Sequence, residues 1–80
     1  MTAYVKLGLM DVDSFCNSIN VLRAEVVALE EDKKIYIKSL ISLLKLDLIK
    51  EICMKINSAD EKELNLFEKI IKRYGGRVCD

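Results

Sequence analysis

The side chains in this sequence that could do chemistry are three cysteines and two groups of carboxylates. The cysteines are Cys16, Cys53 and Cys79, and the 80 residues contain no histidine. Three thiols cannot all pair within one chain, and no C-x-x-C occurs, so the sequence indicates neither a disulfide framework nor a zinc site. Apolar neighbours predict that Cys16 and Cys53 are buried, and a polar tail predicts that Cys79 is exposed. Unpaired thiols are typical of a reducing compartment, which predicts a cytoplasmic protein.

The carboxylates gather at residues 30–32 and at residues 60–63. Solvated helix surface and the helix dipole account for both groups, so we expect neither to bind a metal. The usual acid–base group at neutral pH, histidine, is missing. Gly75-Gly76 is not followed by the Lys and Ser or Thr of a phosphate-binding loop. The sequence therefore predicts no enzyme, with no catalytic, cofactor-binding or metal site.

The elements that would position these side chains are expected to be helical. The chain has no proline and only three glycines, at positions 8, 75 and 76, so residues 9–74 lack both helix breakers. An all-β domain needs turn residues every 8–12 positions, which this chain does not supply. Apolar residues make up 51% and charged residues 32%, a balance that excludes a disordered chain. The predicted fold class is all-α, in one small helical domain covering residues 1–80.

A heptad-like seam marks the first predicted helix. Its apolar residues step by three and four, and they are Val12, Phe15, Ile19, Leu22, Val26 and Leu29. This spacing is typical of a coiled coil and predicts self-association through the seam, most simply as a dimer. A broad apolar stripe continues to Ile56, so we expect one long amphipathic helix over about residues 12–56. A helical hairpin bent near residues 31–34 is the alternative.

The last predicted helix covers residues 59–74. Ser58 and Glu61 fit the spacing of a capping box, and Gly75 is the expected stop. Residues 1–10 are expected to form an N-terminal arm and residues 75–80 a flexible tail. No stretch of about 20 apolar residues occurs, so no membrane partner is expected.

Charge is distributed unevenly along the chain. Residues 1–32 carry two basic and six acidic side chains, a net of −4, and residues 33–80 carry eleven basic and seven acidic side chains, a net of +4. Lys34, Lys38 and Lys45 would share one face of a helix. That face could dock an acidic partner or nucleic acid, or it could simply be solvated surface.

One family resemblance follows from the order of these patterns. Residues 24–30, Ala-Glu-Val-Val-Ala-Leu-Glu, lie in a predicted amphipathic helix, and Glu63-Leu64 leads into the second apolar run at residues 67–72. Over roughly residues 15–74 the sequence resembles IraP, a small coiled-coil anti-adaptor of the bacterial stress response. The resemblance implies a partner of the response-regulator type, the adaptor RssB, which delivers the stationary-phase sigma factor to the ClpXP protease. It implies no site residues, because the start, the break before the last helix and the tail depart from the family.

The function predicted from the sequence is therefore regulation by protein–protein binding, with anti-adaptor activity as its most concrete form. A helical nucleic-acid-associated regulator that uses the basic half after Lys33 is the alternative. A subunit that assembles only with itself is the third interpretation.

Overall fold

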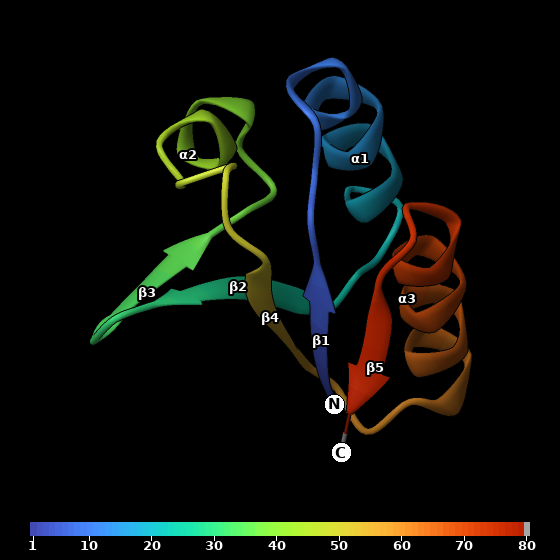
Figure 1. Ribbon diagram of the computed structural model, residues 1–80. Helices are drawn as coiled ribbons and strands as arrows, with labels where there is room; N and C mark the ends of the chain where they lie inside the picture. The colour runs from blue at the N-terminus through green and yellow to red at the C-terminus, as the bar shows by residue number, and fades with distance from the viewer. Residues whose placement is uncertain (80) are drawn as a thin grey trace.

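The computed structural model describes residues 1–79 and contains a five-stranded antiparallel sheet with helices on one face (Figure 1). The strands are β1 (Thr2–Val5), β2 (Glu25–Glu30), β3 (Lys33–Tyr36), β4 (Ile52–Asn57) and β5 (Arg77–Cys79). The helices are α1 (Val12–Ile19), α2 (Leu40–Leu44) and α3 (Glu61–Arg73), and a 3-10 turn, η1 (Leu9–Asp11), leads into α1.

The strand order is β3-β2-β4-β1-β5, and every neighbouring pair is antiparallel. β1 and β2 are therefore parallel to each other with β4 between them, and β4 and β5 are parallel with β1 between them. Each pair is joined through a helix, α1 in the first case and α3 in the second, so the sheet consists of two interlocked split β-α-β units. The hairpin partner β3 and the short helix α2 lie between β2 and β4 in the chain.

One face of the sheet forms the floor of the core. Ala3 and Val5 of β1 alternate with Thr2 and Tyr4, and Ile52, Met54 and Ile56 of β4 alternate with more exposed residues. Successive side chains of a strand point to opposite faces, so the buried set of each strand points toward the helices. Within residues 1–79, the other face of the sheet carries no helix (Figure 1).

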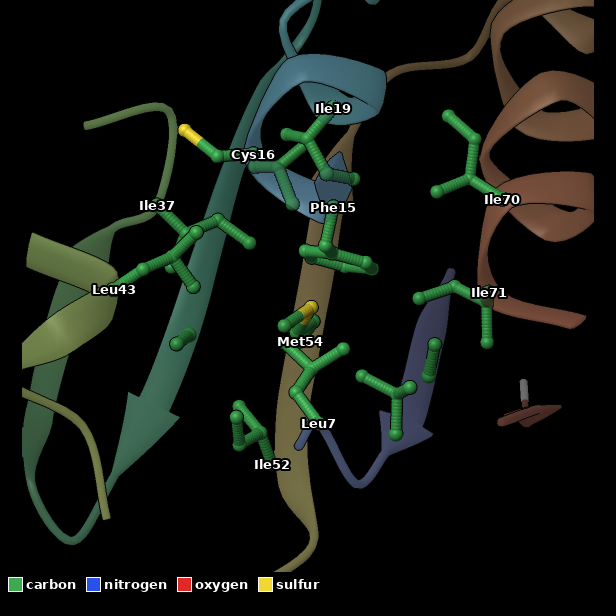
Figure 2. Close-up of a cluster of buried hydrophobic side chains, with 14 of the residues drawn as sticks. Leu7, Phe15, Cys16, Ile19, Ile37, Leu43, Ile52, Met54, Ile70 and Ile71 are labelled. Atoms are coloured by element: carbon green, nitrogen blue, oxygen red, sulfur yellow. The ribbon is translucent and has the colours of Figure 1, made fainter. Parts of the chain in front are cut away.

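The core is built around α1. Figure 2 shows Phe15 and Ile19 of α1 above Met54 of β4, with Leu43 of α2 on one side and Ile71 of α3 on the other. All five side chains are fully buried. At about 25 cal/mol per Å² of apolar surface removed from water, this continuous cluster is the main source of stability for so short a chain.

The all-α prediction is wrong, because the described chain contains five strands and only two helices of more than seven residues. The error is clearest in β4, where the apolar pattern fits both kinds of structure. Ile52 and Ile56 are four residues apart, which is a helical spacing and also two periods of a strand. Met54 between them is buried and Cys53 and Lys55 are less so, which is the alternation of a strand.

The single helix over residues 12–56, and the coiled coil built on it, are also wrong. The helix that begins at Val12 ends at Ile19, and residues 25–36 form the β2–β3 hairpin. The chain does reverse direction near residues 31–34, but between strands rather than between helices. Glu31 and Asp32 make the two-residue turn, and Glu31 adopts φ 54°, a left-handed conformation in which glycine or asparagine is usual. Neither glycine nor asparagine stands at this position, so the usual residue signal for a strand-to-strand turn is missing.

The prediction of a C-terminal helix is confirmed, with bounds Glu61–Arg73 instead of 59–74. Its cap differs from the expected capping box. The Asp60 carboxylate accepts a hydrogen bond from the Lys62 N–H at 3.0 Å, and the Ser58 hydroxyl accepts one from the Asp60 N–H at 3.1 Å. Gly75 has φ 80°, which is the expected left-handed stop.

Both ends of the chain lie in the sheet. Within the expected arm, residues 2–5 form β1, which lies between β4 and β5. Within the expected tail, residues 77–79 form β5 and pair with β1, and Asp80 lies outside the described residues. Residues 2–5 and 77–79, which were expected to lie in an arm and a tail, are therefore part of the folded domain.

Candidate functional site

Large apolar side chains are exposed mainly at one end of the molecule. Of the eight most exposed ones in residues 1–79, six lie on η1, on α2 or in the loop after α2. They are Leu9, Met10, Leu40, Ile41, Leu44 and Ile49, and we call them the apolar patch. Single exposed apolar residues are ordinary, but a group of them marks a surface that binds something.

The helix α2 has an apolar sequence, Leu-Ile-Ser-Leu-Leu, but only part of it faces the core. Leu43 is fully buried and Leu46 just beyond the helix is nearly so, whereas Ile41 is 68% exposed and Leu44 is half exposed. A helix of five residues has too few turns to be stable in water alone. The buried side chains hold α2 to the domain, and the outward ones leave much of their surface in contact with water.

The position of α2 is set by contacts with α1. Ile37, fully buried just before α2, fixes the approach of the chain. The Lys38 carbonyl accepts hydrogen bonds from the Asn20 amide at 2.9 Å and from the Cys16 thiol at 3.4 Å. The Lys38 ammonium donates in turn to the Leu22 carbonyl. The patch residues on α2 are thus presented by a segment fastened at several points.

Cys16 is suited to its place between α1 and the segment that leads into α2. Burial, and then the negative charge of Asp13, raise the pKa of the Cys16 thiol. The thiol therefore keeps its proton at neutral pH and can donate it to the Lys38 carbonyl. The burial predicted for Cys16 and the exposure predicted for Cys79 are confirmed, and Cys53 is half-buried. Cys16 thus helps to hold α1 to the segment that leads into α2.

The other part of the patch belongs to η1. Leu9 is 73% exposed and Met10 is 93% exposed, and neither packs against the core. The turn is closed by a hydrogen bond from the Asp11 N–H to the Gly8 carbonyl at 2.9 Å. Since η1 runs directly into α1, and α1 packs against α2, both parts of the patch lie at the same end of the domain (Figure 1).

The side chains expected to form the self-association seam lie elsewhere. Val12, Phe15 and Ile19 of α1 are buried in the core, as are Leu22 before β2 and Val26 within it. Leu29 is half-buried on β2. These side chains are already packed inside their own chain, so they are not available as a coiled-coil interface. Whether the protein forms a dimer is not tested by these contacts, and self-association stays a prediction.

The expected basic face is not formed, because the helix that would carry it does not exist. Lys34 lies on β3, Lys45 ends α2, and the Lys38 ammonium is engaged with the Leu22 carbonyl. The structure thus separates three side chains that helical spacing would have brought together.

The sequence analysis did not predict the apolar patch, because several of its residues fit the apolar spacing of the long helix that the structure does not contain. Ile41 and Leu44 were assigned to that helix, and Leu9 and Met10 to an arm. The sequence did contain one indication of the patch. Residues 40–48 hold more apolar side chains than one side of a short helix can bury, so some of them must be exposed.

The resemblance to the IraP family depended on residues 24–30 as helix, and these residues lie in and next to strand β2. It therefore offers no help in choosing a partner. None of the helices in residues 1–79 is long and apolar enough to cross a membrane, and the cytoplasmic location stays a prediction. No protein-family model, no curated protein and no solved structure matches the chain.

Proposed function

We propose that this protein is a non-enzymatic binding module that docks a partner protein through the apolar patch. The observation that carries the proposal is the exposure of Ile41 and Leu44 on a short, firmly attached helix, at the same end as Leu9 and Met10. Burying a side chain of this size, instead of leaving it in water, is favourable by roughly 1.5–3 kcal/mol of free energy. A partner surface that covers them would recover that free energy.

The composition of the patch fits a protein partner. Leu, Ile and Met side chains make contacts without direction, and an exposed Met adapts its shape to the surface that it meets. Charged side chains of both signs border the patch, among them Asp11, Lys45 and Asp47. An apolar centre with a polar rim is the usual anatomy of a protein–protein interface. Regulation by occupying a surface of a larger protein is consistent with this anatomy.

The experiment compares the parent with Ile41→Glu/Leu44→Glu as bait in an extract of the cells that make the protein, with retained proteins quantified by mass spectrometry. A matched control is Val21→Glu/Tyr36→Glu, which alters two exposed apolar residues outside the patch. We expect one protein to be retained by the parent and the control and to be reduced at least about tenfold with the patch variant, since two buried charges cost several kcal/mol. That protein, once purified, should bind the parent directly.

The folded state should not change in either variant, because exposed substitutions usually alter stability by about 0.5 kcal/mol or less. Circular dichroism and thermal melting check this. Equal recovery with parent and patch variant would show that the patch is not the docking surface. If sedimentation shows instead that the parent is a dimer and the patch variant a monomer, the occupant is a second copy and the proposal of a separate partner fails.

A further inference from the structure

The face of the sheet that carries no helix has its own chemical character. Its outward residues follow from strand alternation and register, and they are Thr2, Tyr4, Glu25, Val27, Leu29, Lys34, Tyr36, Cys53, Lys55, Asn57, Arg77 and Cys79. We call this set the open face. Val27 is buried but does not belong to the core cluster, because its cover comes from its neighbours on this face. The open face is a second surface, on the side of the sheet opposite the helices.

The open face carries more positive than negative charge. Lys34 on β3, Lys55 on β4 and Arg77 on β5 are exposed, and Glu25 is the one carboxylate among the outward residues. Lys55 lies directly opposite Val27 in the register, and Lys34 lies on the strand at the other side of Val27. Together with Glu25 and Asn57, these three residues line a shallow depression. Two ammonium groups around an apolar floor are arranged to hold an anion.

Aromatic and planar groups lie beside these cations. Tyr36, 59% exposed, is paired with Val27 and so borders the depression. On the same face, toward the opposite edge of the sheet, the Arg77 guanidinium lies 4.8 Å from the centre of the Tyr4 ring and is paired with Glu51 at 2.5 Å. A hydrogen bond with Cys53 is the main cause that raises the pKa of Tyr4, so its ring stays uncharged. Tyrosine rings and guanidinium planes are the surfaces on which unpaired bases stack.

We propose that the open face binds single-stranded nucleic acid. A phosphate would lie between Lys34 and Lys55, with one base on Tyr36 and a second near the Tyr4–Arg77 pair. Antiparallel sheets that combine exposed aromatic residues with a basic surface bind single strands in this way. An acidic peptide could use the lysines, but it would have no flat group for Tyr36. The surface is separate from the apolar patch, so this binding does not depend on the proposed function.

The test is fluorescence anisotropy with labelled single strands of about 12 nucleotides and mixed sequence, as RNA and as DNA, a length within the range that such surfaces cover. With Lys34 and Lys55 as the two phosphate contacts, affinity should fall by about sevenfold between about 50 and 200 mM salt. Lys34→Glu/Lys55→Glu should weaken binding at least tenfold. Tyr36→Ala should weaken it at least about fivefold, the loss of one stacked base.

The matched control is Lys62→Glu/Lys69→Glu, which makes the same change of charge at exposed positions of α3 on the helical side. It should keep the affinity of the parent to within about twofold, as should Ile41→Glu/Leu44→Glu in the apolar patch. Failure of the parent to bind at about 50 mM salt with protein near 10⁻⁴ M, the level of non-specific binding, would overturn the proposal. An equal loss of affinity in the α3 control would also overturn it. The same holds if polyglutamate displaces the labelled strand as effectively as unlabelled strand does.

Discussion

At the scale of single residues, Gly76 shows how closely the end of α3 approaches the sheet. A Cβ atom at this position would lie 2.6 Å from the Tyr4 carbonyl oxygen and 2.7 Å from the Ile71 Cγ2 atom. The Gly76 N–H also donates to the Ile71 carbonyl at 2.9 Å. The backbone of β1 cannot retreat without breaking its pairing with β4, so only glycine fits here.

We therefore predict that Gly76→Ala lowers the free energy of unfolding by about 1–3 kcal/mol, the usual cost of overpacking. Gly8→Ala is the matched control, because Gly8 has φ −77° and a Cβ there would meet nothing closer than 3.4 Å. It should be neutral or slightly stabilising. Urea denaturation followed by circular dichroism measures both. A loss in Gly8→Ala as large as in Gly76→Ala would contradict the assignment.

The raised pKa of Cys16 leads to a second prediction for a single residue, which concerns how stability depends on pH. Its pKa is raised in the folded state by burial and by Asp13, whereas the unfolded thiol titrates near 8.5. Below about pH 8.5 the thiol keeps its proton in both the folded and the unfolded state, so its ionisation does not change the free energy of unfolding. Above that value the unfolded state releases the proton first, so the free energy of unfolding falls as pH rises.

Cys16→Ala should reduce this fall between about pH 7 and pH 9.5, as measured by urea denaturation at each pH. Tyr4 also has a raised pKa, but it titrates in the parent and in the variant alike and does not affect the difference. The same slope in both proteins would show that the Cys16 thiol is not responsible.

At the scale of elements, α3 depends on its docking to the sheet and to α1. Phe67 and Ile71 are fully buried, and Tyr74 just after the helix packs edge-on against Phe15 with ring centres 5.1 Å apart. The Glu63 carboxylate accepts hydrogen bonds from the Arg23 and Ala24 N–H groups at 2.7 and 2.8 Å, which ties the loop before β2 to the first turn of α3.

Phe67→Ala should accordingly cost about 3–5 kcal/mol, since it empties the centre of this contact. For so small a domain this is close to the whole stability. Lys69→Ala, on the exposed side of the same helix, should change stability by about 0.5 kcal/mol or less. Thermal melting by circular dichroism distinguishes the two, and a Phe67→Ala protein that melts like the parent would show that α3 is not held by this side chain.

Elements also show what the sequence could and could not predict. α3 has an acidic first turn, a stop at Gly75 and an apolar face at helical spacing, and all of these signals are local. The strands have no comparable signal. Val26 and Ala28 are core residues of β2 only because β4, which begins at Ile52, pairs with β2, and that pairing is set by residues far away in the chain. The sharp turn at Glu31 is likewise imposed by the pairing of its flanking strands.

At the scale of the whole molecule, composition was misleading about fold. The absence of histidine and the scattered cysteines favour a binding protein over an enzyme, and this stays a prediction. The scarcity of glycine and proline argued for an all-helical chain, but the sheet needs only one tight hairpin, because its other connections pass through helices or longer segments. The apolar patch could not be predicted, since which leucines face outward is decided by how α2 docks on the core.

The position of β1 in the sheet has a consequence for how the chain folds during its synthesis. Its two neighbours, β4 and β5, both lie beyond residue 51, and residues 6–76 separate β1 from β5. A nascent chain that grows at about 5–20 residues per second must therefore wait several seconds before its first strand has both partners. During that time Ala3, Val5 and their unpaired backbone groups are open to wrong pairing. The sheet therefore cannot be completed until residues 77–79 have left the ribosome and paired with β1.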